Sequence, residues 1–163
     1  MKYDHVVKDG EFLHILDGEI ADILKGGKAW VHEGGRAIVL NYGKVWVHEG
    51  GDAQVYEGGY ACVLQEGSAI VHEGGYAQVY DGGTAEIGAA EIGEGADAIV
   101  YAGGTAHVYE GGYTWVHEGG KAIVHVGGYA EVHDGGYAEV LPGGHADGPG
   151  EIVWEEEDDD EDN

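Results

Sequence analysis

Five consecutive octapeptides decide the fold class of this chain; residues 44–83 read KVWVHEGG, DAQVYEGG, YACVLQEG, SAIVHEGG and YAQVYDGG. Each unit has alanine or valine at its second position, valine at its fourth and glycine at its last. Apolar residues at every second position are typical of a short β-strand with one buried face. Glycine suits the turn that must follow, because it adopts positive φ angles without steric cost. The pattern therefore predicts strand, turn, strand, turn along the chain.

The same repeat extends on both sides of this stretch. Its last glycine recurs at every octapeptide from Gly27 to Gly83 and again from Gly104 to Gly144. Glycine accounts for 33 of the 163 residues, and its regular spacing favours a repeat fold over a disordered segment. Between Gly83 and Gly104 the chain is five residues longer than two repeats require, which predicts a loop insertion at 84–95.

These observations predict three regions. Residues 1–26 form an N-terminal cap and first coil, and residues 27–150 form the repetitive body with its insertion. Residues 151–163 form a cap strand followed by a disordered acidic tail, since eight consecutive acids occupy 155–162.

Octapeptides that lie three units apart are similar to each other. Residues 36–43 resemble 60–67, and residues 44–51 resemble 68–75. We therefore expect three octapeptides per coil and an all-β fold, a three-sided parallel β-helix (β-solenoid) of about six coils. With roughly 4.8 Å per rung, such a rod is on the order of 30 Å long. Side chains three octapeptides apart would then stack in columns on its surface.

The Gly-Gly-x-Ala-x-Val units over about residues 26–146 resemble the short-repeat β-solenoids of bacterial surface and prophage proteins, including AIDA-type passenger repeats. The resemblance implies a β-solenoid and brings no catalytic residues with it.

The charge of the chain is strongly negative. Its 32 acids and seven Lys and Arg residues give a formal net charge of -25. This argues against direct contact with nucleic acid or an anionic membrane, and favours a basic partner, cations or a simply solvated surface. Cys62 is the only cysteine, so no intrachain disulfide can form. Neither a signal peptide nor a transmembrane segment is recognisable, which predicts a cytoplasmic protein, in the host cell if a phage encodes it.

Two predicted columns are candidate binding surfaces. The first contains an acid in the turn of every third octapeptide: Asp9, Glu33, Glu57, Asp81, Glu110 and Asp134. The second is an apolar face with histidines, expected to be either a self-association interface or a self-stacking ladder. Its members are Trp46, Ile70, Ile99, Ile123, His48, His72, Tyr101 and His125.

Catalytic and metal-binding motifs are not apparent. The lone serine, Ser68, and Cys62 both occupy ordinary repeat positions, and no Gly-Lys-Ser/Thr follows a glycine pair. His48 and His72 with Glu49 could share an ion, but no Cys-His spacing supports this, so we predict no metal site. Calcium-binding β-rolls use Gly-Gly-x-Gly-x-Asp, where this repeat has Ala and Val. We expect no enzyme and no cofactor, with Ca2+ left as an open alternative.

The sequence therefore favours a non-enzymatic acidic protein that engages a basic partner. Such a protein could act as a phage-type nucleic-acid mimic that inhibits a DNA- or RNA-binding defence protein. The alternative is a virion or cell-surface rod, structural or adhesive, that forms a homo-oligomer through its apolar face.

Overall fold

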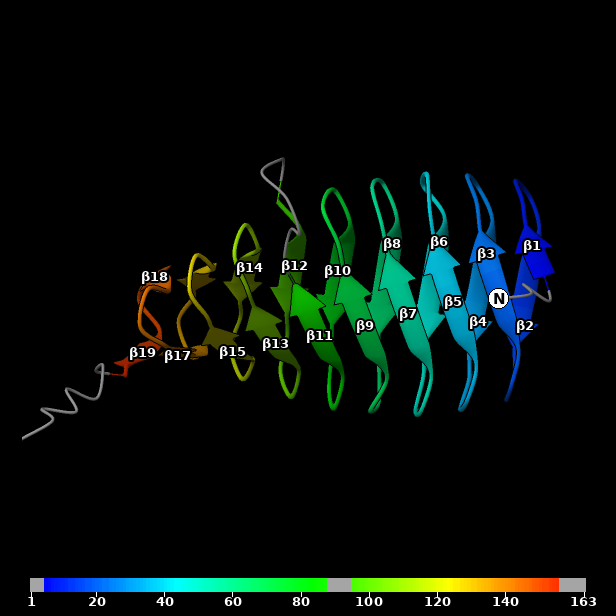
Figure 1. The fold of residues 1–163 in the computed structure, drawn as a ribbon. Helices are drawn as coiled ribbons and strands as arrows, with labels where there is room; N and C mark the ends of the chain where they lie inside the picture. Colours follow the sequence, from blue (N-terminus) through cyan, green and yellow to red (C-terminus); the bar gives the residue numbers. More distant parts are fainter. Residues whose placement is uncertain (1–4, 88–94, 156–163) are drawn as a thin grey trace, which may run out of the picture.

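The computed structural model describes residues 5–87 and 95–155, and these form short parallel strands without any helix (Figure 1). The strands are β1 (His5–Val7), β2 (Phe12–Ile15), β3 (Ile20–Ile23), β4 (Lys28–Val31), β5 (Arg36–Val39), β6 (Lys44–Val47), β7 (Asp52–Val55), β8 (Tyr60–Val63), β9 (Ser68–Val71), β10 (Tyr76–Val79), β11 (Thr84–Ile87), β12 (Asp97–Val100), β13 (Thr105–Val108), β14 (Tyr113–Val116), β15 (Lys121–Val124), β16 (Tyr129–Val132), β17 (Tyr137–Val140), β18 (His145–Asp147) and β19 (Glu151–Trp154).

The strands alternate between two parallel sheets. The odd-numbered strands form a ten-stranded sheet and the even-numbered strands a nine-stranded sheet, here called the odd and the even sheet. Lys28 pairs with Lys44 and Val31 with Val47, so one coil consists of two octapeptides. The predicted all-β parallel solenoid is confirmed. The three-sided coil of three octapeptides is wrong, and so is the count of about six coils, because about nine coils of two strands stack into a rod roughly 45 Å long.

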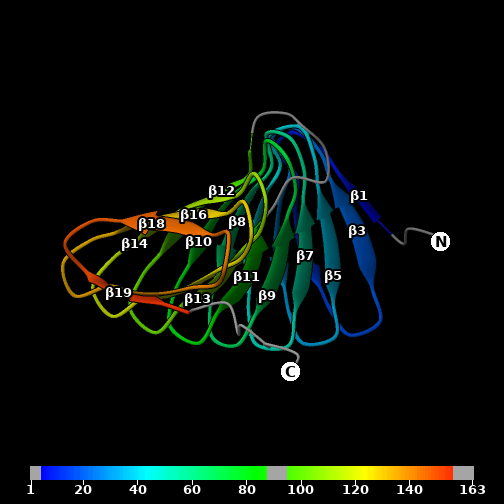
Figure 2. The same ribbon diagram turned by 60° about the vertical axis from the view of Figure 1, so that its left-hand side comes forward.

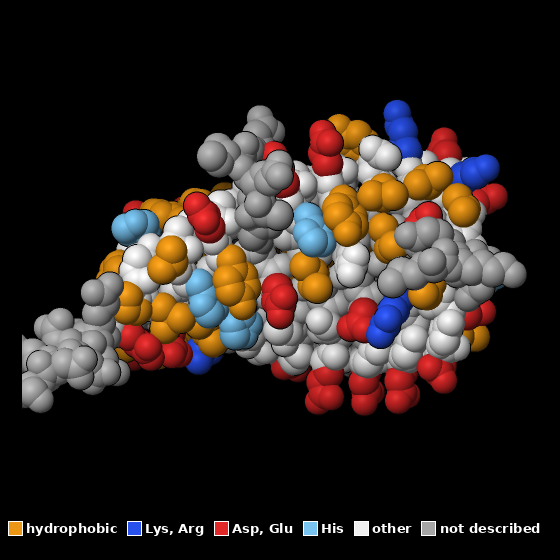
Figure 3. All heavy atoms as spheres, in the orientation of Figure 1, with side chains coloured by type: hydrophobic (Ala, Val, Ile, Leu, Met, Phe, Trp, Pro, Cys, Tyr) orange, Lys and Arg blue, Asp and Glu red, His pale blue; other side chains and the backbone are white. Residues whose placement is uncertain are grey.

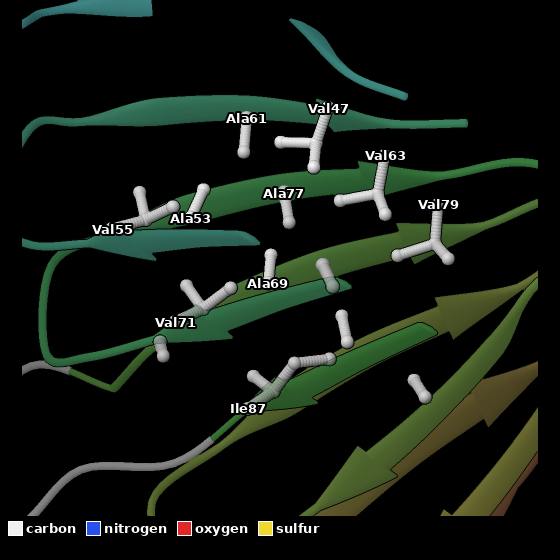
Figure 4. Packing of buried hydrophobic residues seen from close by; sticks show 14 of the residues in the cluster. Val47, Ala53, Val55, Ala61, Val63, Ala69, Val71, Ala77, Val79 and Ile87 are labelled. Atoms are coloured by element: carbon white, nitrogen blue, oxygen red, sulfur yellow. The ribbon is translucent and has the colours of Figure 1, made fainter. Parts of the chain in front are cut away.

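Small apolar side chains fill the space between the two sheets. Alanine at the second position and valine at the fourth point inward from both sides, and Val47, Val63 and Val79 are completely buried (Figure 4). Thr114 replaces one of the alanines, and its hydroxyl donates to the Ala98 carbonyl at 3.2 Å. Because these side chains are short, two sheets can face each other directly, and no third side is needed to enclose the core.

The two glycines of each turn have different roles. Gly34, the first of its pair, has a φ of +72°, in the left-handed region that glycine favours. Gly35, the second, lies so close to the coil beneath that a Cβ there would be 2.6 Å from the Ile15 carbonyl oxygen. Where Tyr42 and Glu66 replace the first glycine they still adopt positive φ, but the second position remains glycine at Gly43 and Gly67.

The repeat is interrupted once within the body. Tyr76 pairs with Asp97 and Thr84 with Thr105, which are five positions further apart in the sequence than other paired residues, so the predicted five extra residues are confirmed. Within the predicted loop, Thr84–Ile87 is the regular strand β11. Most of the predicted loop, residues 88–94, lies outside the described residues.

The two terminal regions continue the same coil. β1 and β2 pair in register with β3 and β4, so the described part of the predicted cap consists of ordinary strands. At the other end β19 pairs with β17, and the predicted tail beyond residue 155 lies outside the described residues. Figure 2 shows that the stacked strands rotate progressively along the rod. In the part of the chain that the structure describes, no helix is long and apolar enough to cross a membrane.

Candidate functional site

The turns of the solenoid lie in two rows, one on each edge of the rod. Turns that follow odd strands form the first edge, and turns that follow even strands form the second. Since three octapeptides amount to one and a half coils, side chains separated by three octapeptides lie on opposite edges. The predicted acidic column therefore does not exist as one line. Asp9, Glu57 and Glu110 lie on the first edge, and Glu33, Asp81 and Asp134 on the second.

A different set of acids does line up on the second edge. They occupy the same turn position in six of its turns, and all are exposed: Asp17, Glu33, Glu49, Asp81, Glu118 and Asp134. We call this set the acidic edge; Gln65 and Ala102 interrupt it. The turns between residues 16 and 136 on this edge contain no Lys or Arg, whereas the first edge contains Lys8 and Lys25. Figure 3 shows acidic side chains in a row along the lower edge of the molecule.

Backbone hydrogen bonds between successive turns hold the acidic edge in register. The amide of Gly34 donates to the Gly50 carbonyl at 2.9 Å, and that of Gly119 donates to the Gly135 carbonyl at 2.8 Å. Acids in successive turns are thus spaced by about one rung, roughly 4.8 Å. Like charges at this separation repel by about 1 kcal/mol in water-like surroundings. A cationic partner would relieve this repulsion.

A row of aromatic rings runs beside the acidic edge. Tyr80, Tyr101, His117 and His133 stack in sequence, with ring centroids 4.7, 5.2 and 4.7 Å apart and planes within 11° of parallel. These rings and three of the acids line an open hollow of about 790 Å³. Further along the same edge His32 lies beside His48, and burial, followed by the charge of His32, lowers the pKa of His48. The edge therefore combines a row of carboxylates with a row of stacked phenol and imidazole rings.

The predicted apolar and histidine face is also divided. Trp46 and Ile99 point outward from the even sheet, and Ile70 and Ile123 from the odd sheet. His48 and Tyr101 lie on the second edge, while His72 and His125 lie on the first.

The two histidines considered as possible ligands of one metal ion are also separated. His48 and His72 are on opposite edges, so they cannot share an ion. Among the described residues no three His, Cys, Asp or Glu side chains are grouped to hold a metal ion.

The outer surface of the even sheet is a feature that the three-sided interpretation missed. Its outward side chains are largely aromatic: Phe12, Trp30, Trp46, Tyr60, Tyr76, Tyr113, Trp115 and Tyr129. Tyr60 stacks on Tyr76 with centroids 5.3 Å apart, and Tyr113 on Tyr129 at 5.0 Å. The signal was present in the sequence, because residues 28–35 and 44–51, which are two octapeptides apart, are identical at seven of eight positions.

Comparisons with known proteins add little beyond the fold. No model of a known protein family and no curated protein sequence matches this chain. Among solved structures, the chain is similar to a TibC-catalysed hyper-glycosylated fragment of TibA. The two are 21% identical over 94% of this chain and 90% of that one, with a TM-score of 0.33. A TM-score this low supports no argument about function, and the β-solenoid fold rests on the strand pairing described above.

Proposed function

We propose that this chain is a non-enzymatic binding protein whose acidic edge engages a basic partner. The main observation is the arrangement of the six exposed carboxylates of the acidic edge, in register along one side of the rod, with no Lys or Arg in the same turns. The net charge of -25 also attracts a basic partner, and it does so over a longer range. Such a surface accelerates encounter with cationic molecules and loses strength as salt increases.

The partner that fits best is a protein with an elongated basic groove, as nucleic-acid-binding proteins have. Duplex DNA carries one negative charge per about 1.7 Å of its axis. The acidic edge offers about one per 4.8 Å rung. Any imitation of nucleic acid would therefore lie in the sign and extent of the charge, and not in matched phosphate positions. Inhibition of a defence protein is the specific form of this proposal that the sequence favours.

The test compares two triple variants with the same loss of charge. One changes the acidic edge: Asp17→Asn, Glu33→Gln and Glu49→Gln. The other changes outward acids of the odd sheet: Asp22→Asn, Asp52→Asn and Glu86→Gln. Binding of a fluorescent lysine-rich peptide is measured for both by anisotropy. We expect the edge variant to bind several-fold more weakly than the control, because the edge concentrates the field. Equal weakening in both variants, or wild-type binding that persists unchanged at about 0.5 M salt, would count against the proposal.

A structural or adhesive rod is the second candidate, favoured by the elongated shape and by exposed aromatic side chains on the even sheet. Phe12 is 49% and Trp30 40% exposed. The surface involved would differ from the predicted apolar face, because that face is divided between two sheets.

A further inference from the structure

One patch of the molecule has the opposite charge to the rest. It lies on and beside the outer surface of β2, β4 and β6, and consists of Phe12, Lys25, Lys28, Trp30, Lys44 and Trp46. We call it the cationic face. The outward positions of these three strands include no carboxylate. The acids of its flanking turns are Asp9 and Glu11 on the first edge and Asp17, Glu19, Glu33 and Glu49 on the second.

The lysines of this face are not neutralised within the described residues. Two bases of the odd sheet have acidic partners: Arg36 lies 3.7 Å from Asp52, and Lys121 lies 3.1 Å from Glu139. No comparable ion pair involves Lys25, Lys28 or Lys44 in the part of the chain that the structure describes. Lys44 instead lies 4.2 Å from the centre of the Tyr60 ring, which holds its ammonium group over the aromatic surface.

We propose that the cationic face binds the acidic run 155–162 of a second copy of this chain, so that copies associate head to tail. That run contains eight consecutive carboxylates, the densest negative charge in the sequence. In the sequence it follows directly after β19, and β19 lies at the opposite end of the rod from β2, β4 and β6 (Figure 1). Charge complementarity and this placement at opposite ends together favour a head-to-tail contact.

The length of the acidic run argues for a second copy over the same molecule. β6 lies seven rungs from β19 and β4 eight, or roughly 34 and 38 Å at about 4.8 Å per rung. Eight residues span at most about 29 Å when fully extended. Whatever path the run takes, few of its carboxylates could reach Lys44 of their own chain, and fewer still Lys28. In a second copy, all eight carboxylates are free of this limit and can approach Lys28 and Lys44.

The two ends of the sheets are compatible with such an arrangement. Among the described residues, β1 and β2 at one end and β18 and β19 at the other each have one edge without a neighbouring strand. Because all strands run parallel, the terminal strand of one copy presents its backbone N–H and C=O groups in the same arrangement as an internal strand does. The contact between the acidic run and the cationic face would bring these ends together.

The experiment measures self-association of the full chain by sedimentation velocity over a range of concentrations, in low salt and in about 0.5 M salt. A tail variant has the eight acids of 155–162 changed to Gln and Asn. A face variant carries Lys28→Gln and Lys44→Gln. The matched control, Arg36→Gln with Lys121→Gln, removes the same charge from the odd sheet. Circular dichroism confirms that each variant keeps its β-structure.

We expect wild type and control to associate at low salt, and the tail and face variants to associate at least about tenfold more weakly. A monomeric wild type at low salt would overturn the proposal. So would a tail variant or a face variant that associates as wild type does. None of these results depends on the acidic edge, so they leave the proposed function separately testable.

Discussion

The hydroxyl of Tyr113 donates a hydrogen bond to the carboxylate of Glu131 at 2.7 Å, across 18 positions of the sequence. The same offset joins Lys121 to Glu139, at 3.1 Å, and His14 to His32, at 3.0 Å. One coil of two octapeptides plus two positions along the strand accounts for this offset, so these are diagonal neighbours on the outer surface. These diagonal contacts add to those between residues 16 positions apart, such as Arg36 with Asp52.

A double-mutant cycle on Lys121 and Glu139 should show a small favourable coupling, as for other exposed ion pairs. Lys121 also lowers the pKa of the Glu139 carboxyl, chiefly through its hydrogen bond. The control cycle uses Asp97 and Lys121, three octapeptides apart, which would stack in a three-sided coil but lie on opposite sheets. We expect no coupling there. Chemical denaturation of the single and double variants to alanine gives both values, and a coupled control pair would contradict the coil of two octapeptides.

Alanine substitutions should separate the two roles of glycine in the turns. Gly18→Ala places a Cβ in open space at a φ of +78° and should cost about 1 to 2 kcal/mol of unfolding free energy, the strain of the left-handed region. Gly35 does not have a positive φ, but Gly35→Ala brings its Cβ against the Ile15 carbonyl oxygen, so the coils must separate, at a cost of about 1 to 3 kcal/mol. Denaturant unfolding measures both losses, and a Gly35→Ala variant as stable as wild type would show that close approach of the coils is unimportant.

Replacing His72 by tyrosine should reduce the sensitivity of the fold to acid. The His72 ring stacks on Tyr56 with centroids 4.3 Å apart, and burial lowers its pKa below the ordinary 6.5. A lowered histidine pKa means that the unfolded chain binds the proton more readily. The stability contributed by neutral His72 is therefore present above about pH 6.5 and is lost as the pH falls through the folded-state pKa.

Tyrosine occupies the equivalent position at Tyr56 and Tyr109, so the ring stack should survive in His72→Tyr. Thermal unfolding of both proteins between pH 8 and 5 isolates the effect, because every other titrating group is shared. We expect the melting temperature of wild type to fall further than that of the variant. An equal fall in melting temperature for the two proteins would contradict a lowered pKa of His72 in the folded state.

Asp97→Asn should stabilise the protein at neutral pH. Asp97 pairs with Tyr76 and Tyr113 on the even sheet, and burial raises the pKa of its carboxyl above 3.8. A raised carboxyl pKa gives stability that is present below about pH 3.8 and is lost as the pH rises through the folded-state value. The gain in melting temperature should therefore appear at pH 7 and vanish near pH 3. Glu86→Gln, at an exposed position of the odd sheet, is the control, and an equal gain there would indicate only the loss of one negative charge.

The candidate surfaces show how the number of octapeptides per coil decides what can be inferred from a repeat. The acids were recognised from their turn position, but Glu33 and Glu57 lie on opposite edges, whereas Glu33 and Glu49 are neighbours. The matching octapeptides at 28–35 and 44–51 point to a period of two octapeptides. The similarity of octapeptides three units apart has no role in stacking in this structure, and nothing in it explains that similarity.

The sequence by itself determined the strands, the turns, the inward alanines and valines and the five-residue insertion, because each depends only on local backbone chemistry and on alternation within one octapeptide. The number of octapeptides in a coil was decided by the tertiary structure. The same strand and turn can build a coil of two or of three sides, and the choice depends on how closely two sheets can approach across their side chains. Alanine and valine allow direct contact between the sheets, and that contact placed Asp17, Glu33 and Glu49 in one row and Lys28 and Lys44 in another.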